Sequence, residues 1–235
     1  MRYNPSTDEI AWLELLEKSQ NTLAHTIDSS DLRLIPKWEI RYLLWASVFV
    51  NQAASGFLIL QKAHSYDAAK LLIRPMLEVF LGAQAVINKR GFLFRKIYTE
   101  LLEFCKSDPN ATQAVIDETV KKYITAFKNY DKNYPCDPRR VDMPYTAKVA
   151  DMVDHYEVTY RVYCKFTHGA QIAVTGALNE VTDMMDTPFA VELLLRTLGL
   201  LQKHTSETVP QLANLREEYK TLFQNFKRTN PGLAK

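Results

Sequence analysis

The sequence predicts an all-α protein, an irregular bundle of about seven or eight helices. Two observations lead to this prediction. The 235 residues include only 7 glycines, fewer than the turns of a β-sandwich normally use, and apolar residues recur at helical spacing rather than in the alternation typical of strands. With 47% hydrophobic and 24% charged residues, the chain is too apolar for disorder, and we expect a single domain over residues 1–235.

The first helix is predicted to begin just after Ser6, which forms a capping box with Glu9, and to end near Ile27. Together with the polar loop that follows, it accounts for residues 1–35. A second long helix is predicted over residues 36–64, because its first residue is a proline, which suits a first helical turn, and a long apolar run follows.

The middle of the chain contains three further predicted helices. The first covers residues 66–88 and has Pro75 inside it, so we expect a bend there. A shorter helix follows over residues 91–106. Asp108 and Pro109 have the residue types of an N-cap and a first helical position, which predicts that the next helix begins there.

A proline-rich segment, residues 129–144, interrupts the helical pattern and is predicted to be a long loop. The rest of the chain returns to helical spacing. We expect a helix over residues 147–167, with room for a break around Asp154. A further helix is predicted over residues 186–201, which start with Asp-Thr-Pro, and a last one over residues 210–226.

Charge and cysteine content favour a soluble protein of the cytoplasm. The 29 basic and 27 acidic residues leave a net charge of +2, and the 3 cysteines are too few and too widely spaced for a disulfide framework. The chain does not start with a signal-peptide pattern. Polar residues interrupt the apolar stretch over residues 43–60, so we interpret it as a buried helix and expect no membrane association.

Several chemistries lack their motifs in this sequence. It has no glycine-rich phosphate loop, no HExxH, no Glu-x-x-His pair and no GxSxG elbow, and its 5 histidines are far apart along the chain. We therefore expect neither a metal ion nor a cofactor.

One polar face stands out on the predicted helix that ends near residue 167. With Glu157 taken as the zero direction, Arg161 falls at about 40° and His168 at about 20°, so the three share one face of the helix. Tyr160 and Tyr163 lie directly beside that face. The helix therefore presents a charged strip next to a tyrosine strip.

Two interpretations of this face stay open. Arg161 has a permanently charged fork that suits a phosphate, and His168 can move protons near neutral pH. Together they are sufficient in principle for metal-free cleavage of a phosphodiester by internal attack, with Glu157 orienting the guanidinium. Alternatively, Glu157 and Arg161 form a surface ion pair, and His168 lies at a helix end, where its charge suits the dipole.

A second polar stripe lies on the predicted helix 66–88. Its members, Asp67, Lys70, Arg74 and Glu78, fall within about 80° of one another inside an otherwise apolar segment. The Arg74–Glu78 pair is either a solvated ion pair or a partly buried pair that faces the polar strip described above.

A basic and aromatic segment, residues 121–140, is the third candidate. It has a local net charge of +4 with tyrosines and a phenylalanine interleaved, which is the composition of a site for single-stranded nucleic acid. A solvated connection between helices explains the same composition. The cations that would contact nucleic acid are Lys121, Lys122, Lys128, Arg139 and Arg140.

Two stretches of the sequence resemble a known family. Residues 68–78 contain the pattern LxRxxxE, and residues 160–169 contain a tyrosine followed by a histidine. Together they resemble an uncharacterised family of all-helical bacterial proteins, a domain of unknown function, whose members pair an LxRxxxE helix with a Y…S…H helix. The resemblance covers residues 40–205, and Cys164 stands where a serine is expected.

Six residues separate Arg161 from His168, a spacing similar to the Arg-x(4–6)-His signature of the HEPN superfamily of helical bundles. This resemblance implies a HEPN-like core and a metal-independent ribonuclease, with Arg161 and His168 as the catalytic pair near a dimer interface. Val162 departs from the pattern, because the residue after the arginine is commonly polar. The supporting residues would be Glu157, Arg74, Glu78, Tyr160 and Tyr163.

The expected function is therefore a HEPN-like ribonuclease of a toxin–antitoxin or phage-defence system. Its expected partners are a second copy of the chain, RNA and an antitoxin. The alternative is a non-catalytic dimeric interaction module, in which Arg74, Glu78, Arg161 and His168 form a structural polar network.

Overall fold

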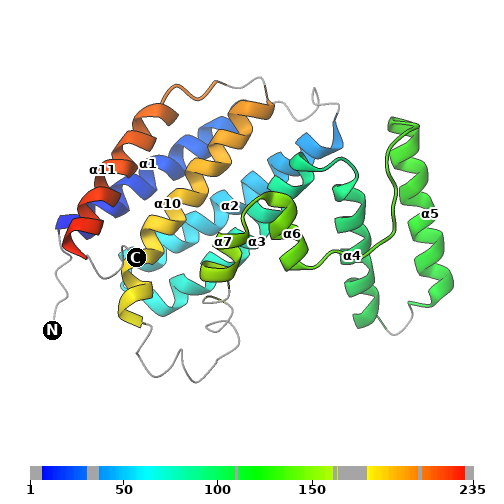
Figure 1. Cartoon of the computed structure of the whole chain (residues 1–235), viewed down its shortest axis with the longest axis horizontal. Helices are drawn as coiled ribbons and strands as arrows, with labels where there is room; N and C mark the ends of the chain where they lie inside the picture. The colour runs from blue at the N-terminus through cyan, green and yellow to red at the C-terminus, as the bar shows by residue number, and fades with distance from the viewer. Residues whose placement is uncertain are drawn as a thin grey trace. The chain divides into compact units, whose positions relative to one another are not determined.

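The computed structural model describes residues 7–30, 37–108, 111–160, 163, 179–205 and 208–230, and Figure 1 shows their arrangement. Every regular element in this part of the chain is helical: nine α-helices and one π-helix, with no strand. The all-α prediction is confirmed. The expected number of about seven or eight helices agrees with this result, since the additional pieces are short helices that follow residue 142.

Contacts between Cα atoms divide the chain into two compact units, residues 1–80 with 157–235 and residues 81–156. The single domain expected from the sequence stays a prediction. The two units differ in charge: residues 81–156 contain 12 Lys or Arg and 10 Asp or Glu, whereas the other unit contains 17 of each. The whole formal charge of +2 therefore belongs to the smaller unit.

The larger unit is built on four long helices, α1 (Thr7–Ser29), α2 (Trp38–Lys62), α10 (Asn179–His204) and α11 (Leu212–Thr229). In Figure 1, α1 packs against each of the other three, and α10 also packs against α2 and α11. Full burial of a leucine or phenylalanine stabilises a fold by about 2 kcal/mol per side chain. The buried residues that contribute here include Leu15, Leu16, Leu23, Leu43, Leu44, Phe57, Leu194 and Leu198.

The helix α3 (Tyr66–Asn88) has the bounds that the sequence predicts and includes Pro75. Its apolar side chains recur at i, i+3, i+4 and i+7, which is the spacing of one helix face, and they are fully buried. Arg74 and Glu78 each follow a buried residue by one position, which turns them about 100° away from it around the helix axis, and their side chains are partly exposed. The buried residues are Ile73, Met76, Leu77 and Phe80.

The smaller unit contains α4 (Phe92–Ser107), α5 (Gln113–Tyr130), α6 (Met143–Ala150) and α7 (Val153–His155). α4 packs against α5, and residues 131–142 form the connection between α5 and α6, within the segment predicted as a loop. The centre of the Phe127 ring lies 5.7 Å from the centre of the Phe94 ring and 4.7 Å from that of the Tyr134 ring. These three buried rings fix the start of the connection on the two helices.

A glycine at the start of α4 allows the connection to approach closely. Gly91 is the N-cap of α4 and has a φ of 85°, in the left-handed region that favours glycine. A Cβ atom added to Gly91 would lie 2.8 Å from Cβ of Pro135 and 2.9 Å from its carbonyl oxygen. Any other residue at this position would be strained and would displace the proline.

The predicted start of the fifth helix at Asp108 and Pro109 is wrong. Asp108 is the C-cap of α4, and Pro109 lies outside the described residues. The helix begins instead at Gln113, because the hydroxyl of Thr112 accepts a hydrogen bond from the backbone amide of Val115. The cap residue was therefore misidentified by four positions.

The helix predicted over residues 147–167, with room for a break around Asp154, has a different start and a different break in the described residues. α6 begins earlier, at Met143, because Oδ1 of Asp142 accepts a 2.8 Å hydrogen bond from the backbone amide of Tyr145. It ends before Asp151, which has a φ of 59°. The break therefore lies at Asp151 rather than around Asp154, and the chain continues as the short helix α7 and then as the π-helix η2 (Tyr156–Tyr160).

The helix predicted to begin with Asp-Thr-Pro at residue 186 begins seven residues earlier. α10 starts at Asn179 and continues through Pro188. Asp186 is not an exposed cap: its side chain is fully buried and accepts a hydrogen bond from the hydroxyl of Tyr163. The Asp-Thr-Pro sequence, although typical of a helix start, is used here inside a helix.

α2 and α3 are long and apolar enough to cross a membrane by length and composition alone. In α2, 44% of the most apolar window is buried inside the protein, and in α3 the share is 50%. Core helices of soluble proteins pass the same test. The expectation of a protein without a membrane segment, located in the cytoplasm, stays a prediction.

Candidate functional site

Arg74, Glu78 and Tyr160 form a polar cluster that joins α3 to η2. Nε of Arg74 donates a 2.8 Å hydrogen bond to Oε1 of Glu78, and the hydroxyl of Tyr160 donates a 2.9 Å hydrogen bond to the same oxygen. Nη2 of Arg74 lies 3.5 Å from the Tyr160 oxygen, and the guanidinium carbon lies 5.5 Å from the centre of the ring. One carboxylate oxygen thus accepts from a cation and from a phenol.

This cluster is partly shielded from water. The side chain of Arg74 is 22% exposed, that of Glu78 is 33% exposed, and Tyr160 is buried. Partial burial makes a charged hydrogen bond stronger than it is in a fully solvated pair. The Arg74–Glu78 pair is therefore partly buried, and its predicted position facing Arg161 and His168 stays a prediction, because both residues lie outside the described part of the chain.

The tyrosines of this segment are positioned by a π-helix rather than by an α-helix. Hydrogen bonds in η2 run from i to i+5, so its residues do not advance by the 100° per residue of an α-helix. The angle between Glu157 and Tyr160 predicted for a regular α-helix is therefore wrong. In η2, Tyr156 and Tyr160 are buried and Glu157 is exposed.

The predicted catalytic pair, Arg161 and His168, lies outside the described residues, as does Val162. Arg161 follows Tyr160 directly in the sequence. Of the described residues, Tyr160 directly precedes Arg161, and Tyr163 lies between Arg161 and His168 in the sequence.

Tyr163 belongs to a different contact from Tyr160. Its hydroxyl donates a hydrogen bond to Oδ1 of Asp186, and its ring stacks on that of Phe189 with the centres 6.3 Å apart. Tyr163 and Asp186 are both buried. Asp186 was not among the predicted site residues, because the Asp-Thr-Pro pattern indicated a helix cap.

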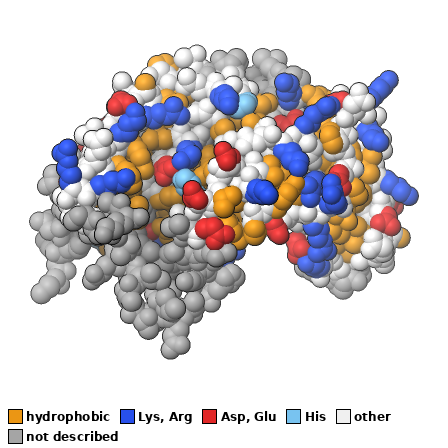
Figure 2. Space-filling model, in the orientation of Figure 1, with side chains coloured by type: hydrophobic (Ala, Val, Ile, Leu, Met, Phe, Trp, Pro, Cys, Tyr) orange, Lys and Arg blue, Asp and Glu red, His pale blue; other side chains and the backbone are white. Residues whose placement is uncertain are grey.

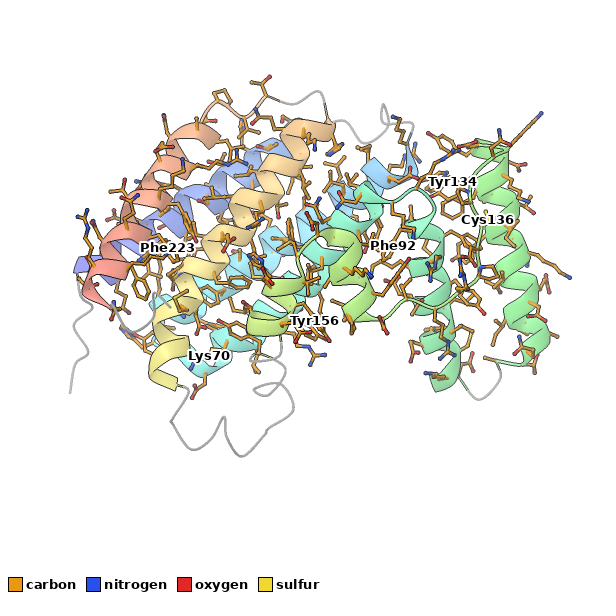
Figure 3. The ribbon with its side chains drawn as sticks, in the orientation of Figure 1. Lys70, Phe92, Tyr134, Cys136, Tyr156 and Phe223 are labelled. Atoms are coloured by element: carbon orange, nitrogen blue, oxygen red, sulfur yellow. The ribbon has the colours of Figure 1, made fainter. Side chains whose placement is uncertain are left out.

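The first two members of the polar stripe on α3 differ sharply in exposure. Nζ of Lys70 lies 3.6 Å from Oδ1 of Asp67; the lysine side chain is 1% exposed and the aspartate side chain 92% exposed. Figure 3 labels Lys70 on α3. The stripe is therefore not one solvated face, since it contains a buried lysine as well as the Arg74–Glu78 pair.

The cations predicted to contact nucleic acid are exposed, and several already have acidic neighbours. Lys122 pairs with Glu118 at 2.8 Å, Arg139 pairs with Asp137, and Arg140 lies 4.0 Å from Glu103. On the face drawn in Figure 2, Lys and Arg side chains are interspersed with Asp and Glu. A continuous basic surface, which single-stranded nucleic acid prefers, is not visible on that face.

The interleaved aromatic residues divide into two groups. Tyr123 and Tyr130 are exposed on α5, whereas Phe127 and Tyr134 are buried. At 100° per residue, Tyr123 and Tyr130 lie about 140–180° from Lys121 and Lys128 around the helix axis. The exposed rings and these two lysines therefore occupy opposite faces of α5.

A second polar cluster, which the sequence did not indicate, surrounds Tyr145 in the smaller unit. Nζ of Lys89 donates a 2.8 Å hydrogen bond to the Tyr145 hydroxyl oxygen, and Nη1 of Arg95 donates one of 3.0 Å to the same atom. Both cations also lie over the ring, at 5.4 and 4.9 Å from its centre. These residues are 50 or more positions from Tyr145 along the chain, so no local pattern could have indicated the contact.

The two cations change the acidity of the phenol. Hydrogen bonding from Lys89 is the largest cause that lowers the pKa of Tyr145 below its usual value of 10.0, with a further contribution from Arg95. Both interactions favour the ionised phenolate. Tyr145 is therefore a tyrosine with an altered proton affinity on a surface that carries two positive charges.

Metal-binding groups do not gather in the described part of the chain. No three His, Cys, Asp or Glu side chains there lie close enough together to hold a metal ion. Cys105 and Cys136 are free thiols, and Cys164 lies outside the described residues. Cys136, labelled in Figure 3, has its pKa raised by burial.

The fold and these clusters define an all-helical protein with two polar side-chain clusters, one in each compact unit. No protein-family model, no curated protein and no solved structure matches the chain.

Proposed function

We propose that the protein is a metal-independent endoribonuclease of the HEPN-like type, with Arg161 and His168 as its catalytic pair. The observation that carries this proposal is the contact of Tyr160 with Arg74 and Glu78. It joins the LxRxxxE helix to the residue directly before Arg161. The LxRxxxE stretch and the stretch that begins at Tyr160 are the two parts of the sequence that together resemble the all-helical family.

The chemistry needs one group to move a proton and one to steady the phosphate. His168 takes the proton of a ribose 2′-hydroxyl, whose oxygen then attacks the adjacent phosphorus. The bond from phosphorus to the 5′-oxygen breaks, and the departing oxygen takes a proton from water. Arg161 donates to the non-bridging phosphate oxygens as their charge grows. The products are a 2′,3′-cyclic phosphate and a 5′-hydroxyl end.

Arg74, Glu78 and Tyr160 act in this proposal as positioning residues. Their hydrogen bonds hold the end of η2 against α3, and Arg161 continues from that end. Fixed side chains lower the cost of aligning a catalytic pair with its substrate. By resemblance, the cellular setting is a toxin–antitoxin or phage-defence system, in which an antitoxin and a second copy of the chain are the partners.

The test is cleavage of a single-stranded RNA by the purified protein in the presence of EDTA. Wild type is compared with Arg161→Ala, His168→Ala and His25→Ala, the last being an exposed histidine on α1 that serves as the matched control. We expect cleavage by wild type and His25→Ala and its loss in the other two, with unchanged melting temperatures. Equal cleavage by His168→Ala and wild type would refute the proposal.

A second candidate function is a non-catalytic dimeric interaction module, and an exposed stripe on α2 favours it. Trp38, Trp45 and Ile59 are 38%, 54% and 64% exposed, and they are 7 and 14 residues apart. Tyr42 and Phe49 lie between them, with the ring of Trp45 5.4 Å from Tyr42 and 6.3 Å from Phe49. Heptad spacing of large apolar side chains is typical of a helix that pairs with a copy of itself.

Sedimentation velocity distinguishes this second candidate. Trp45→Ser should weaken a dimer, whereas Leu71→Ser, an exposed apolar residue of α3 outside the stripe, should leave it intact. A monomeric wild type over the micromolar range, or equal effects of the two variants, would exclude self-association through α2. RNA cleavage by a stable monomer would favour the ribonuclease without this interface.

A further inference from the structure

The cluster around Tyr145 contains two positive charges that converge on one uncharged oxygen. Lys89 and Arg95 lie within 2.8 and 3.0 Å of the phenol oxygen. No carboxylate lies within ion-pair distance of either cation in the described part of the chain. Within the described residues, half of the 12 cations of this unit have such a partner; for example, Arg90 pairs with Asp131, Lys96 with Glu100 and Arg139 with Asp137.

Arg95 is held in place by neutral groups only. Its Nε lies 3.3 Å from the carbonyl oxygen of Arg139, and its Nη2 lies 3.2 Å from that of Arg140. With Nη1 bonded to Tyr145, three of the five N–H groups of the guanidinium are used. The charge is therefore oriented by the backbone but not neutralised, which is the preorganised state of an anion-binding arginine.

The hydroxyl of Tyr145 retains its own hydrogen for a ligand. A hydroxyl accepts two hydrogen bonds and donates one. The Tyr145 oxygen accepts from Lys89 and Arg95, and within the described residues no acceptor receives its O–H. Lys89 is exposed and uses one of its three N–H groups. Donors from two side chains therefore remain available beside the fixed charge of Arg95.

We propose that Lys89, Arg95 and Tyr145 form a binding site for a terminal phosphate group. One phosphate oxygen accepts the O–H of Tyr145 and a second accepts from Lys89, while Arg95 supplies the second positive charge. A terminal phosphate is preferred over a phosphodiester because its two negative charges match the two cations. The proposal does not depend on the ribonuclease activity, since every residue it uses lies within the smaller unit.

Other charged groups near the site set its limits. The Asp137 carboxylate accepts a hydrogen bond from Arg139, and this bond is the largest cause that lowers its pKa. The charges of Arg95 and Lys89 lower the same pKa further, but to a lesser extent. Because Asp137 pairs with Arg139, its negative charge reduces the positive potential at the site, but its oxygens do not accept hydrogen bonds from Lys89 or Tyr145. The ring of Phe92 stacks on that of Tyr145, with centres 6.1 Å apart, and keeps the phenol in place.

Isothermal titration calorimetry at constant ionic strength tests the proposal with methyl phosphate as the probe. Lys89→Gln and Tyr145→Phe should each weaken binding by about tenfold to a hundredfold, the value of a hydrogen bond to a charged group. Lys122→Gln removes the same charge from the same unit at a lysine paired with Glu118, and it should change binding by less than about twofold. Equal weakening by Lys122→Gln and Lys89→Gln, or no binding by wild type, would overturn the site.

A second titration distinguishes the sources of the phosphate. An oligonucleotide with a 5′-phosphate is compared with the same oligonucleotide carrying a 5′-hydroxyl. If the site takes the end of a nucleic acid, the 5′-phosphate should tighten binding in wild type and not in Lys89→Gln. If it takes small phosphorylated molecules, methyl phosphate alone should show the Lys89 dependence. The absence of this dependence with both probes contradicts the proposal.

Discussion

The hydroxyl of Tyr160 donates a 2.9 Å hydrogen bond to Oε1 of Glu78, a residue 82 positions earlier in the chain. The same carboxylate oxygen accepts from Nε of Arg74 at 2.8 Å. This shared acceptor couples an ion pair within one helix to a tyrosine of another segment. It is the described contact that connects the two sequence stretches on which the proposed function rests.

Removal of the Tyr160 hydroxyl tests the energetic value of this contact. Tyr160→Phe should lower the free energy of unfolding by about 1 kcal/mol, because the carboxylate of Glu78 loses one donor in a partly shielded place. Urea denaturation measures the change. Tyr98→Phe on α4, a tyrosine whose hydroxyl forms no hydrogen bond within the described residues, is the matched control and should be nearly neutral.

A double-mutant cycle tests whether Glu78 and Tyr160 act on each other. Glu78→Gln and Tyr160→Phe should show a coupling free energy of about 0.5–1.5 kcal/mol. The coupling arises because the second substitution removes a hydrogen bond that the first has already weakened. Strict additivity of the two single effects would mean that the hydrogen bond does not contribute to stability.

The phenol of Tyr145 should ionise below the usual tyrosine pKa of 10.0. Its pKa is lowered first by Lys89 and then by Arg95, so the stabilisation of the phenolate is full above about pH 10 and is lost as the pH falls through the folded-state pKa. Tyrosinate absorbance near 295 nm measures the titration. Lys89→Gln should raise the pKa of the Tyr145 component of this titration, and Tyr145→Phe should remove that component.

Acid should weaken the contact between Arg90 and Asp131. The hydrogen bond from Arg90 is the largest cause that lowers the pKa of Asp131, with a second contribution from the backbone amide of Asn133. A lowered carboxyl pKa contributes stability above the unfolded value of 3.8 and loses it as the pH falls through the folded value. Arg90→Gln should therefore flatten the dependence of unfolding on pH in the acid range, and an unchanged profile would show that the pair has no effect.

Gly91 should resist substitution. Gly91→Ala should lower the free energy of unfolding by about 1–3 kcal/mol, because its φ of 85° is unfavourable for alanine and the added Cβ meets Pro135 at 2.8 Å. Gly56→Ala provides the comparison. Gly56 lies within α2, and its added Cβ meets only the end of the Leu72 side chain at 3.1 Å. Thermal melting of the two variants should separate them clearly.

The sequence predicts α3 because strong local signals agree there. The apolar period of α3 and the residues that flank it predict both of its ends, Tyr66 and Asn88. The i,i+4 spacing of Arg74 and Glu78 predicts their ion pair. These features depend on residues within one helix, where the number of residues between two side chains determines how close they lie in space.

Features that depend on the backbone or on distant residues could not be predicted in this way. The helix break at Asp151 uses a left-handed aspartate, without the glycine that usually indicates such a position. A π-helix at 156–160 has no side-chain signature. The contacts of Tyr163 with Asp186 and of Tyr145 with Lys89 join residues 23 and 56 positions apart, so only the tertiary fold brings them together.

The proposed ribonuclease is tested most directly by the single-turnover rate of RNA cleavage in EDTA, measured for wild type and His168→Ala. The proposal predicts a metal-independent rate in wild type that falls by about 100-fold or more in the variant, the usual value of a proton-transfer group. The cleaved RNA should carry a 2′,3′-cyclic phosphate. A wild-type rate no faster than that of His168→Ala, with both proteins folded, would contradict it.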